Sequence, residues 1–88
     1  MGRCYRMPLY MDVHRNVEGD AEAVAEAHRK DVETQESYGV DYKSYWVDED
    51  AGAVFCLFEG PNKEAGERVH KEAHGLVADE IFEVEEGH

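Results

Sequence analysis

The sequence predicts an α+β domain in which two helices pack on one face of a four-stranded antiparallel sheet. Three observations lead to this prediction: stretches of alternating polarity, two stretches of helical period, and one stretch that is apolar on both faces. The chain has 88 residues, enough for one domain with a single modest core. We therefore expect one domain over residues 7–88, preceded by an N-terminal extension over residues 1–6, which show no periodicity.

The first strand and the first helix are expected between residues 9 and 38. Residues 9–15 alternate in polarity, as a half-buried strand does. The apolar side of this strand, expected to face the core, contains Leu9, Met11 and Val13. The opposite side contains Tyr10, Asp12 and His14. Asp20 then suits the N-cap of a helix over residues 21–38, and Gly39 supplies the left-handed residue that ends it.

A hairpin is expected after this helix. Residues 40–47 are rich in valine and aromatic side chains, which favours a strand. Residues 48–52 form an acidic turn that contains a glycine. The partner strand, residues 53–59, is apolar on both of its faces, and a strand that is buried on both faces is typically central in its sheet.

A second helix and a final strand complete the chain. Residues 60–62, Gly-Pro-Asn, open the helix, and Gly75 follows its last turn. Residues 78–85 place Phe82 and Val84 on one face and two glutamates, Glu83 and Glu85, on the other, as in an edge strand. The resulting order, βαββαβ, is that of a ferredoxin-like sandwich whose central strands are residues 9–15 and 53–59.

One face of this sheet is expected to need a cover. Right-handed crossovers put both helices on the same face and leave the other face open. Because residues 53–59 are apolar on both sides, the open face is apolar too, and 88 residues leave nothing to cover it. A homodimer packed sheet to sheet, forming a dimeric α/β barrel, is the expected solution.

The chain is strongly acidic, with 21 aspartate and glutamate residues against 9 lysine and arginine residues and a formal charge of -12. Such a surface repels phosphate backbones and anionic lipids, so nucleic-acid and membrane partners are not expected. No apolar run approaches the ~20 residues that cross a bilayer, and the N-terminus shows no secretion signal. Cys4 and Cys56 do not suggest a disulfide framework. We therefore expect a cytoplasmic protein with free thiols.

Two histidines on the second helix and one on the first form the candidate metal site. His70 and His74 are four residues apart, so both imidazoles can point from one helix face at one ion. The two helices are expected to start from the same end of the sheet and to run parallel. His28 and His70 each lie eight residues past the predicted cap of their helix, so they should face each other at the same depth.

Acidic neighbours extend this ligand set. Asp31 follows His28 by three residues and is the preferred carboxylate ligand, whereas Glu72 points away from the direction of His70 and His74. Three imidazole nitrogens suit nickel, zinc or copper about equally, and an octahedral nickel site would add carboxylate or water oxygens. Two plainer interpretations stay open: the histidines are hydrogen-bonded packing residues, or they bind metal only adventitiously.

The open sheet face offers a second candidate site. Alternation places there Tyr10, Asp12, His14, one of Tyr42 and Trp46, and Cys56. Between the sheets of a dimer they could line a pocket for a small aromatic or oxidisable ligand, which makes a small-molecule binder or a cofactor-free oxygenase the alternative function. The plainer interpretation is an interface core with some polar side chains. The sequence contains no Ser-His-Asp order, phosphate loop, Cys-x-x-Cys pair or glycine-rich dinucleotide motif, so catalysis has little support.

Five segments together point to a known group: MPLY at 7–10, AHRKD at 27–31, YWVD at 45–48, VFCL at 54–57 and VHKEAHGLVADEI at 69–81. They resemble the small nickel-binding single-domain proteins of bacteria, long catalogued as a family of unknown function. The resemblance extends from residue 7 to about residue 87 and implies a ferredoxin-like fold, a dimer and a nickel site. It also implies that His28, His70 and His74 are the histidines of the nickel-binding type, while His70 and Cys56 are shared with other branches. The expected function is nickel binding or buffering.

Overall fold

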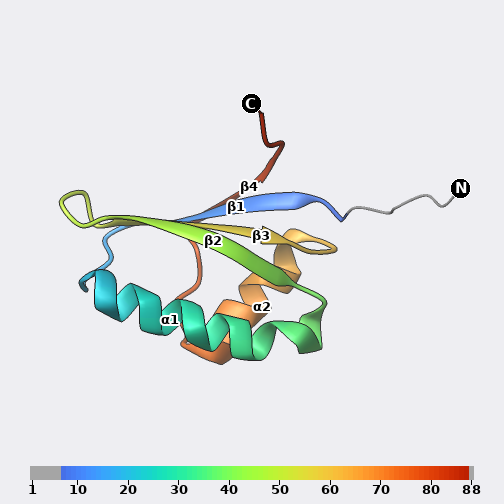
Figure 1. Ribbon diagram of the computed structural model, residues 1–88, viewed down its shortest axis with the longest axis horizontal. Helices are drawn as coiled ribbons and strands as arrows, with labels where there is room; N and C mark the ends of the chain where they lie inside the picture. The colour runs from blue at the N-terminus through green and yellow to red at the C-terminus, as the bar shows by residue number, and fades with distance from the viewer. Residues whose placement is uncertain (1–6, 88) are drawn as a thin grey trace, which may run out of the picture.

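A computed structural model describes residues 7–87 and has the predicted order βαββαβ (Figure 1). Its elements are β1 (Leu9–His14), α1 (Ala21–Thr34), the 3-10 helix η1 (Gln35–Tyr38), β2 (Asp41–Asp48), β3 (Ala53–Glu59), α2 (Lys63–Ala73) and β4 (Glu80–Val84). The predicted extension at residues 1–6, with Cys4, lies outside the described residues, as does His88. Within the described residues, no helix is long and apolar enough to cross a membrane.

Side-chain caps set where both helices begin. The Asp20 carboxylate accepts a hydrogen bond of 2.9 Å from the backbone N–H three residues on, and the Asn62 side chain accepts one of 2.8 Å in the same way. The predicted first helix is divided, because its last four residues tighten into η1. Gly39 follows with a φ of 68°, the left-handed conformation expected at the end of this helix.

The sheet has the order β2-β3-β1-β4 with antiparallel neighbours, so β1 and β3 are central, as predicted. Both helices cover one face of the sheet, which gives the predicted ferredoxin-like sandwich (Figure 1). The predicted direction of the helices was wrong. Because β1 and β3 are antiparallel, the helices that follow them start from opposite ends of the sheet, and α1 and α2 run in opposite directions.

The predicted inner and outer faces of β1 are exchanged. Tyr10, Asp12 and His14 are all buried and lie beneath the helices, where Asp12 contacts His70 of α2. The apolar side of the strand lies on the open face instead. Polarity alone predicts the reverse, but polar groups can be buried when they have buried polar partners, and Asp12 and His14 both contact His70.

A β-bulge places the aromatic residues of β2. The pairing of β2 with β3 shifts its register just after Tyr42. As a result Tyr42 and Tyr45 both face the helices: the Tyr42 hydroxyl reaches Asp12, and the Tyr45 ring lies against His28. Trp46 is 51% exposed and lies on the open face. The two aromatic alternatives for the sheet-face pocket are therefore on opposite sides of the sheet.

α2 approaches the sheet closely at Gly66. The ring of Phe58 is fully buried, with its centroid 5.2 Å from that of Tyr10 and 5.0 Å from that of Tyr42. A Cβ atom at Gly66 would lie 2.3 Å from the Phe58 ring. The missing side chain thus lets α2 approach the sheet, and this brings His70, one turn later, into contact with β1.

Candidate metal centre

His70 is the centre of the candidate site. Its side chain is 1% exposed and lies between two buried carboxylates. His70 Nε2 is 2.8 Å from Asp12 Oδ2 of β1, and His70 Nδ1 is 2.9 Å from Asp31 Oδ1 of α1. One imidazole therefore joins the sheet to both helices and belongs to two sets of potential metal donors.

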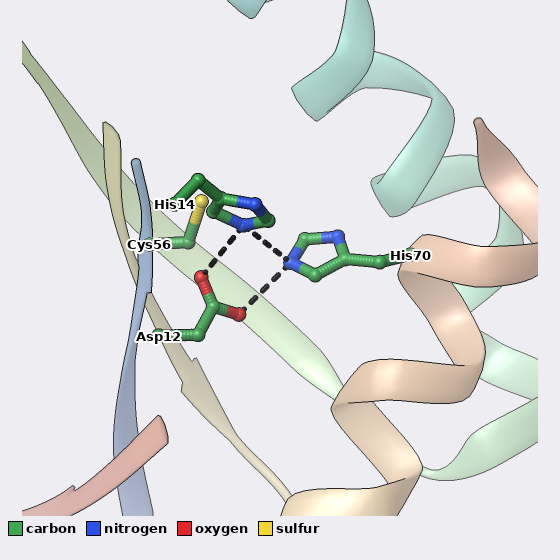
Figure 2. Close-up of side chains that lie close together, drawn as sticks. All are labelled: Asp12, His14, Cys56 and His70. Atoms are coloured by element: carbon green, nitrogen blue, oxygen red, sulfur yellow. Dashed lines mark hydrogen bonds and ion pairs between the residues drawn. The ribbon is translucent and has the colours of Figure 1, made fainter. Parts of the chain in front are cut away.

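The deep donor group lies on the sheet side of His70 and consists of Asp12, His14, Cys56 and His70 (Figure 2). All four residues are buried. His14 Nε2 lies 3.2 Å from Asp12 Oδ1 and 3.3 Å from His70 Nε2. The Tyr42 hydroxyl donates a hydrogen bond of 3.1 Å to Asp12 Oδ2. A carboxylate, two imidazoles and a thiol together suit several transition metals.

The outer donor group lies on the helix side and consists of Asp31, His70 and His74. Asp31 Oδ1 is 2.9 Å from both His70 Nδ1 and His74 Nε2. The donor atoms all lie within 4.8 Å of one another. The structure thus brings together three of the four residues that the sequence predicts as metal ligands, with contributions from both helices.

The charges in this network support one another. Burial alone would lower the pKa of His70, but hydrogen bonds to Asp12 and Asp31 outweigh it and raise that pKa to about 11. Burial alone would raise the pKa of Asp12, but the neighbouring imidazoles of His14 and His70 lower it to about 2. The pKa of Asp31 is lowered against burial in the same way, by His70 and His74. Without a metal, His70 is an imidazolium between two carboxylates at neutral pH.

Each donor group contains one buried atom without a hydrogen-bond partner among the described residues: Asp12 Oδ1 in the deep group and His74 Nε2 in the outer group. His74 Nε2 is close to Asp31, but the two are not oriented as a hydrogen bond. An unsatisfied buried polar group costs about 1–3 kcal/mol. A cation coordinated by such an atom would offset this cost, so the donor set fits a divalent transition metal.

His28 belongs to neither donor group. Because the helices run in opposite directions, the α1 residue that faces His70 is Asp31 rather than His28. The His28 ring instead lies 4.7 Å from the ring of Tyr45, measured between centroids. Its Nδ1 is buried and, within residues 7–87, has no hydrogen-bond partner.

The predicted sheet-face pocket was wrong in its location. Tyr10, Asp12, His14 and Cys56 are buried beneath the helices, and only Trp46 is on the open face. These residues therefore cannot line a space between two sheets, which removes the basis for the alternative function.

The deep donor group is what sequence reasoning missed. Alternation correctly placed Asp12, His14 and Cys56 on one face of the sheet. Asp12 and His14 lie on a central strand, where polar side chains need a buried polar partner, and this pair was the signal available in the sequence. That partner is His70.

Comparisons with known proteins agree with this fold. The family model described as "Nickel responsive protein SCO4226-like" matches residues 10–84. The crystal structure of SCO4226 from Streptomyces coelicolor A3(2) is similar, with 38% sequence identity and a TM-score of 0.84, over 91% of this chain and 99% of that chain. A search of curated proteins finds no match. The chain therefore belongs to the SCO4226-like family of nickel responsive proteins.

Proposed function

We propose that the protein binds and buffers nickel, or a similar divalent transition metal, through the outer donor group. The observation that carries this proposal is the convergence of Asp31, His70 and His74 from two helices, with donor atoms within 4.8 Å of one another. The site also lies at the C-terminal end of α2, where the helix dipole favours a cation. Nickel would be held reversibly by these side chains, and no catalytic step is required of them.

The choice of nickel is supported by the family rather than by the donors. One carboxylate and two imidazoles suit nickel, zinc and copper alike, whereas the matching family model describes nickel responsive proteins.

Calorimetry of tag-free, metal-free protein with Ni²⁺ and Zn²⁺ tests the proposal. Replacing His74 with alanine should weaken nickel binding by at least about tenfold, because it removes a direct ligand. Lys71→Ala, on the exposed side of the same helix, is the matched control and should bind as the wild type does. His28→Ala should bind nickel as the wild type does if Asp31, His70 and His74 are the ligands. Weaker binding would instead support the three-histidine set predicted from sequence. A His74→Ala isotherm identical to that of the wild type would reject the outer donor group.

Two spectroscopic readouts separate the outer group from the deep group. The Leu76 N–H donates a hydrogen bond of 3.1 Å to His74 Nδ1. Ligation through Nε2 puts the ring proton on Nδ1 and breaks this bond, so nickel in the outer group should shift the Leu76 amide signal. Nickel in the deep group should instead bind Cys56 as a thiolate and give a charge-transfer absorption band. Burial raises the pKa of Cys56 to about 11, so this thiol is protonated in the metal-free protein.

We also propose that two chains pair through the open face of the sheet and that the protein works in the cytoplasm. The open face is lined by apolar side chains from all four strands, namely Leu9, Met11, Val13, Trp46, Phe55, Leu57, Phe82 and Val84. Half-exposed Trp46 and Phe82 are large apolar residues that a partner would remove from water. The buried free thiol of Cys56 suits a reducing compartment.

A further inference from the structure

A cavity of about 410 Å³ opens beside the outer donor group. It lies between α1, the sheet, the loop at residues 15–19 and the loop at residues 74–79. This volume is within the range of small-molecule sites. Most of the wall is apolar, and Leu76 and Val77, which are 58% and 49% exposed, form part of it. The cavity therefore also accounts for two large apolar side chains that are exposed on a loop.

Outside the two donor groups, one polar atom in the described wall is without a hydrogen-bond partner. His28 lines the cavity, and its Nδ1 is buried with no hydrogen bond to any described residue. The neighbouring Tyr45 also lines the cavity, with its ring tilted by 44° against the imidazole. A ligand with an aromatic ring and one hydrogen-bonding group would pack on these two rings and satisfy Nδ1.

The charge of the wall excludes anions from this class of ligand. Glu18 and Asp79 line the cavity, the charge of Asp31 in its wall is paired with that of His70, and the whole chain has a formal charge of -12. Arg15 also lines it, but its guanidinium is 2.7 Å from Glu80 Oε1, so its charge is already paired. A carboxylate in this cavity would meet like charges and no free cation in the described wall.

We propose that this cavity binds a small neutral aromatic molecule that has a single hydroxyl or nitrogen, hydrogen-bonded to His28 Nδ1. The proposal goes beyond metal binding and does not depend on it, because the ligand's contacts are to residues outside both donor groups. Asp31, His70 and His74 also line the cavity, so a bound molecule would lie next to the outer donor group. Such a molecule would alter the access of an ion to these donors.

Titration of metal-free protein with 2-naphthol, followed by amide NMR, tests the proposal. Saturable shifts are expected at Ala27, His28, Leu76 and Val77. Naphthalene lacks the hydroxyl, and 2-naphthoate adds a negative charge, so each should bind about tenfold more weakly than 2-naphthol. His28→Leu should weaken the binding of 2-naphthol to that of naphthalene and leave naphthalene unchanged. Equal binding of the three probes, or shifts confined to the open sheet face, would overturn the proposal.

A pair of substitutions on α1 provides a steric test with its own folding control. Ala27 lines the cavity, whereas Ala25 is exposed and does not. Ala27→Phe should fill the cavity and abolish the binding of 2-naphthol, while Ala25→Phe should leave it unchanged. Circular dichroism of both variants establishes that they are folded. Retained binding in a folded Ala27→Phe protein would contradict the assignment of the cavity.

Discussion

The imidazole of His70 joins three elements of the fold, since it contacts Asp12 of β1, Asp31 of α1 and Tyr42 of β2. Removing it would leave two buried carboxylates without a counter-charge, and breaking a buried ion pair in this way costs about 3–5 kcal/mol. Truncation of His70 therefore tests folding as well as metal binding. His74, at the end of α2, is the sharper site for a metal experiment.

The lowered pKa of Asp12 predicts how the metal-free protein responds to acid. Asp12 has a pKa of about 2 in the folded state, against an ordinary value of 3.8 for an aspartate carboxyl group. Its ionised form stabilises the fold above about pH 4, and this contribution, on the order of 2 kcal/mol, should be lost as the pH falls from about 4 to about 2. Urea unfolding between pH 2 and pH 7 measures the loss.

Two variants isolate the contribution of this carboxylate. Asp12→Asn keeps the size of the side chain and removes its charge, so its free energy of unfolding should be lower at neutral pH and should depend less on pH between 4 and 2. Asp50→Asn, in the exposed hairpin turn, should follow the wild-type pH profile. Parallel profiles for Asp12→Asn and the wild type would show that Asp12 is not stabilised as an anion.

At the residue scale, local rules predict part of the candidate metal site. The i, i+4 spacing correctly placed His70 and His74 on one face of α2, and Asp31 was correctly placed near them. His28 was placed opposite His70 only by assuming parallel helices. Which residues meet across two elements depends on their relative direction, and spacing within one helix cannot supply it.

At the scale of elements, the caps and glycine stops determine the order and the bounds of the helices. Asp20, Asn62 and Gly39 each act as the sequence predicts. The bulge after Tyr42 could not be predicted from the sequence of β2 alone. A bulge is defined by the pairing of two strands, so it is recognised only when the register of β2 against β3 is known. That one residue decides which aromatic side chains of β2 face the helices.

Gly66 provides a prediction at the same scale. Alanine is a better helix former than glycine by about 1 kcal/mol, so Gly66→Ala would stabilise an isolated helix. Here the added Cβ would lie 2.3 Å from the buried Phe58 ring, so the protein should instead be destabilised by about 1–3 kcal/mol. Thermal and urea unfolding measure the change.

A neighbouring variant controls for the helix itself. Glu67→Ala, at an exposed position of α2, should change the free energy of unfolding by no more than about 0.5 kcal/mol. Phe58→Leu should also reduce the penalty of Gly66→Ala, since it removes the ring that the new Cβ meets. A Gly66→Ala protein more stable than the wild type would mean that α2 does not depend on this close approach.

At the scale of the whole molecule, the topology follows from the sequence, but the inside and outside of the sheet do not. Polarity places Asp12 and His14 on the open face of the sheet, and in most strands the polar side does face away from the core. Here a histidine on α2 and a carboxylate on α1 turn the polar side of β1 into part of the core. A buried network of this kind depends on residues far apart in the chain, so no local pattern predicts it.

The open sheet face predicts the behaviour of the whole molecule in solution. Sedimentation should show a dimer, and Phe82→Glu should convert it to a monomer at the same protein concentration, because the new charge would be buried at the interface. Val32→Glu is the matched control: Val32 is 42% exposed on α1, against 49% for Phe82 on the sheet. A wild-type monomer at high concentration, or an unchanged dimer in Phe82→Glu, would contradict pairing through this face.

The hydrogen bonds between His70 and its two aspartates bear on how a metal ion would exchange under the proposed function. In small zinc domains the ligands repel or scatter without metal, so loss of the ion unfolds the chain. In this protein a proton on His70 takes the place of a cation and holds the same carboxylates together. Under the proposed function, the metal-free protein is thus already ordered for binding, and uptake and release would be an exchange of a metal ion for protons within a folded protein.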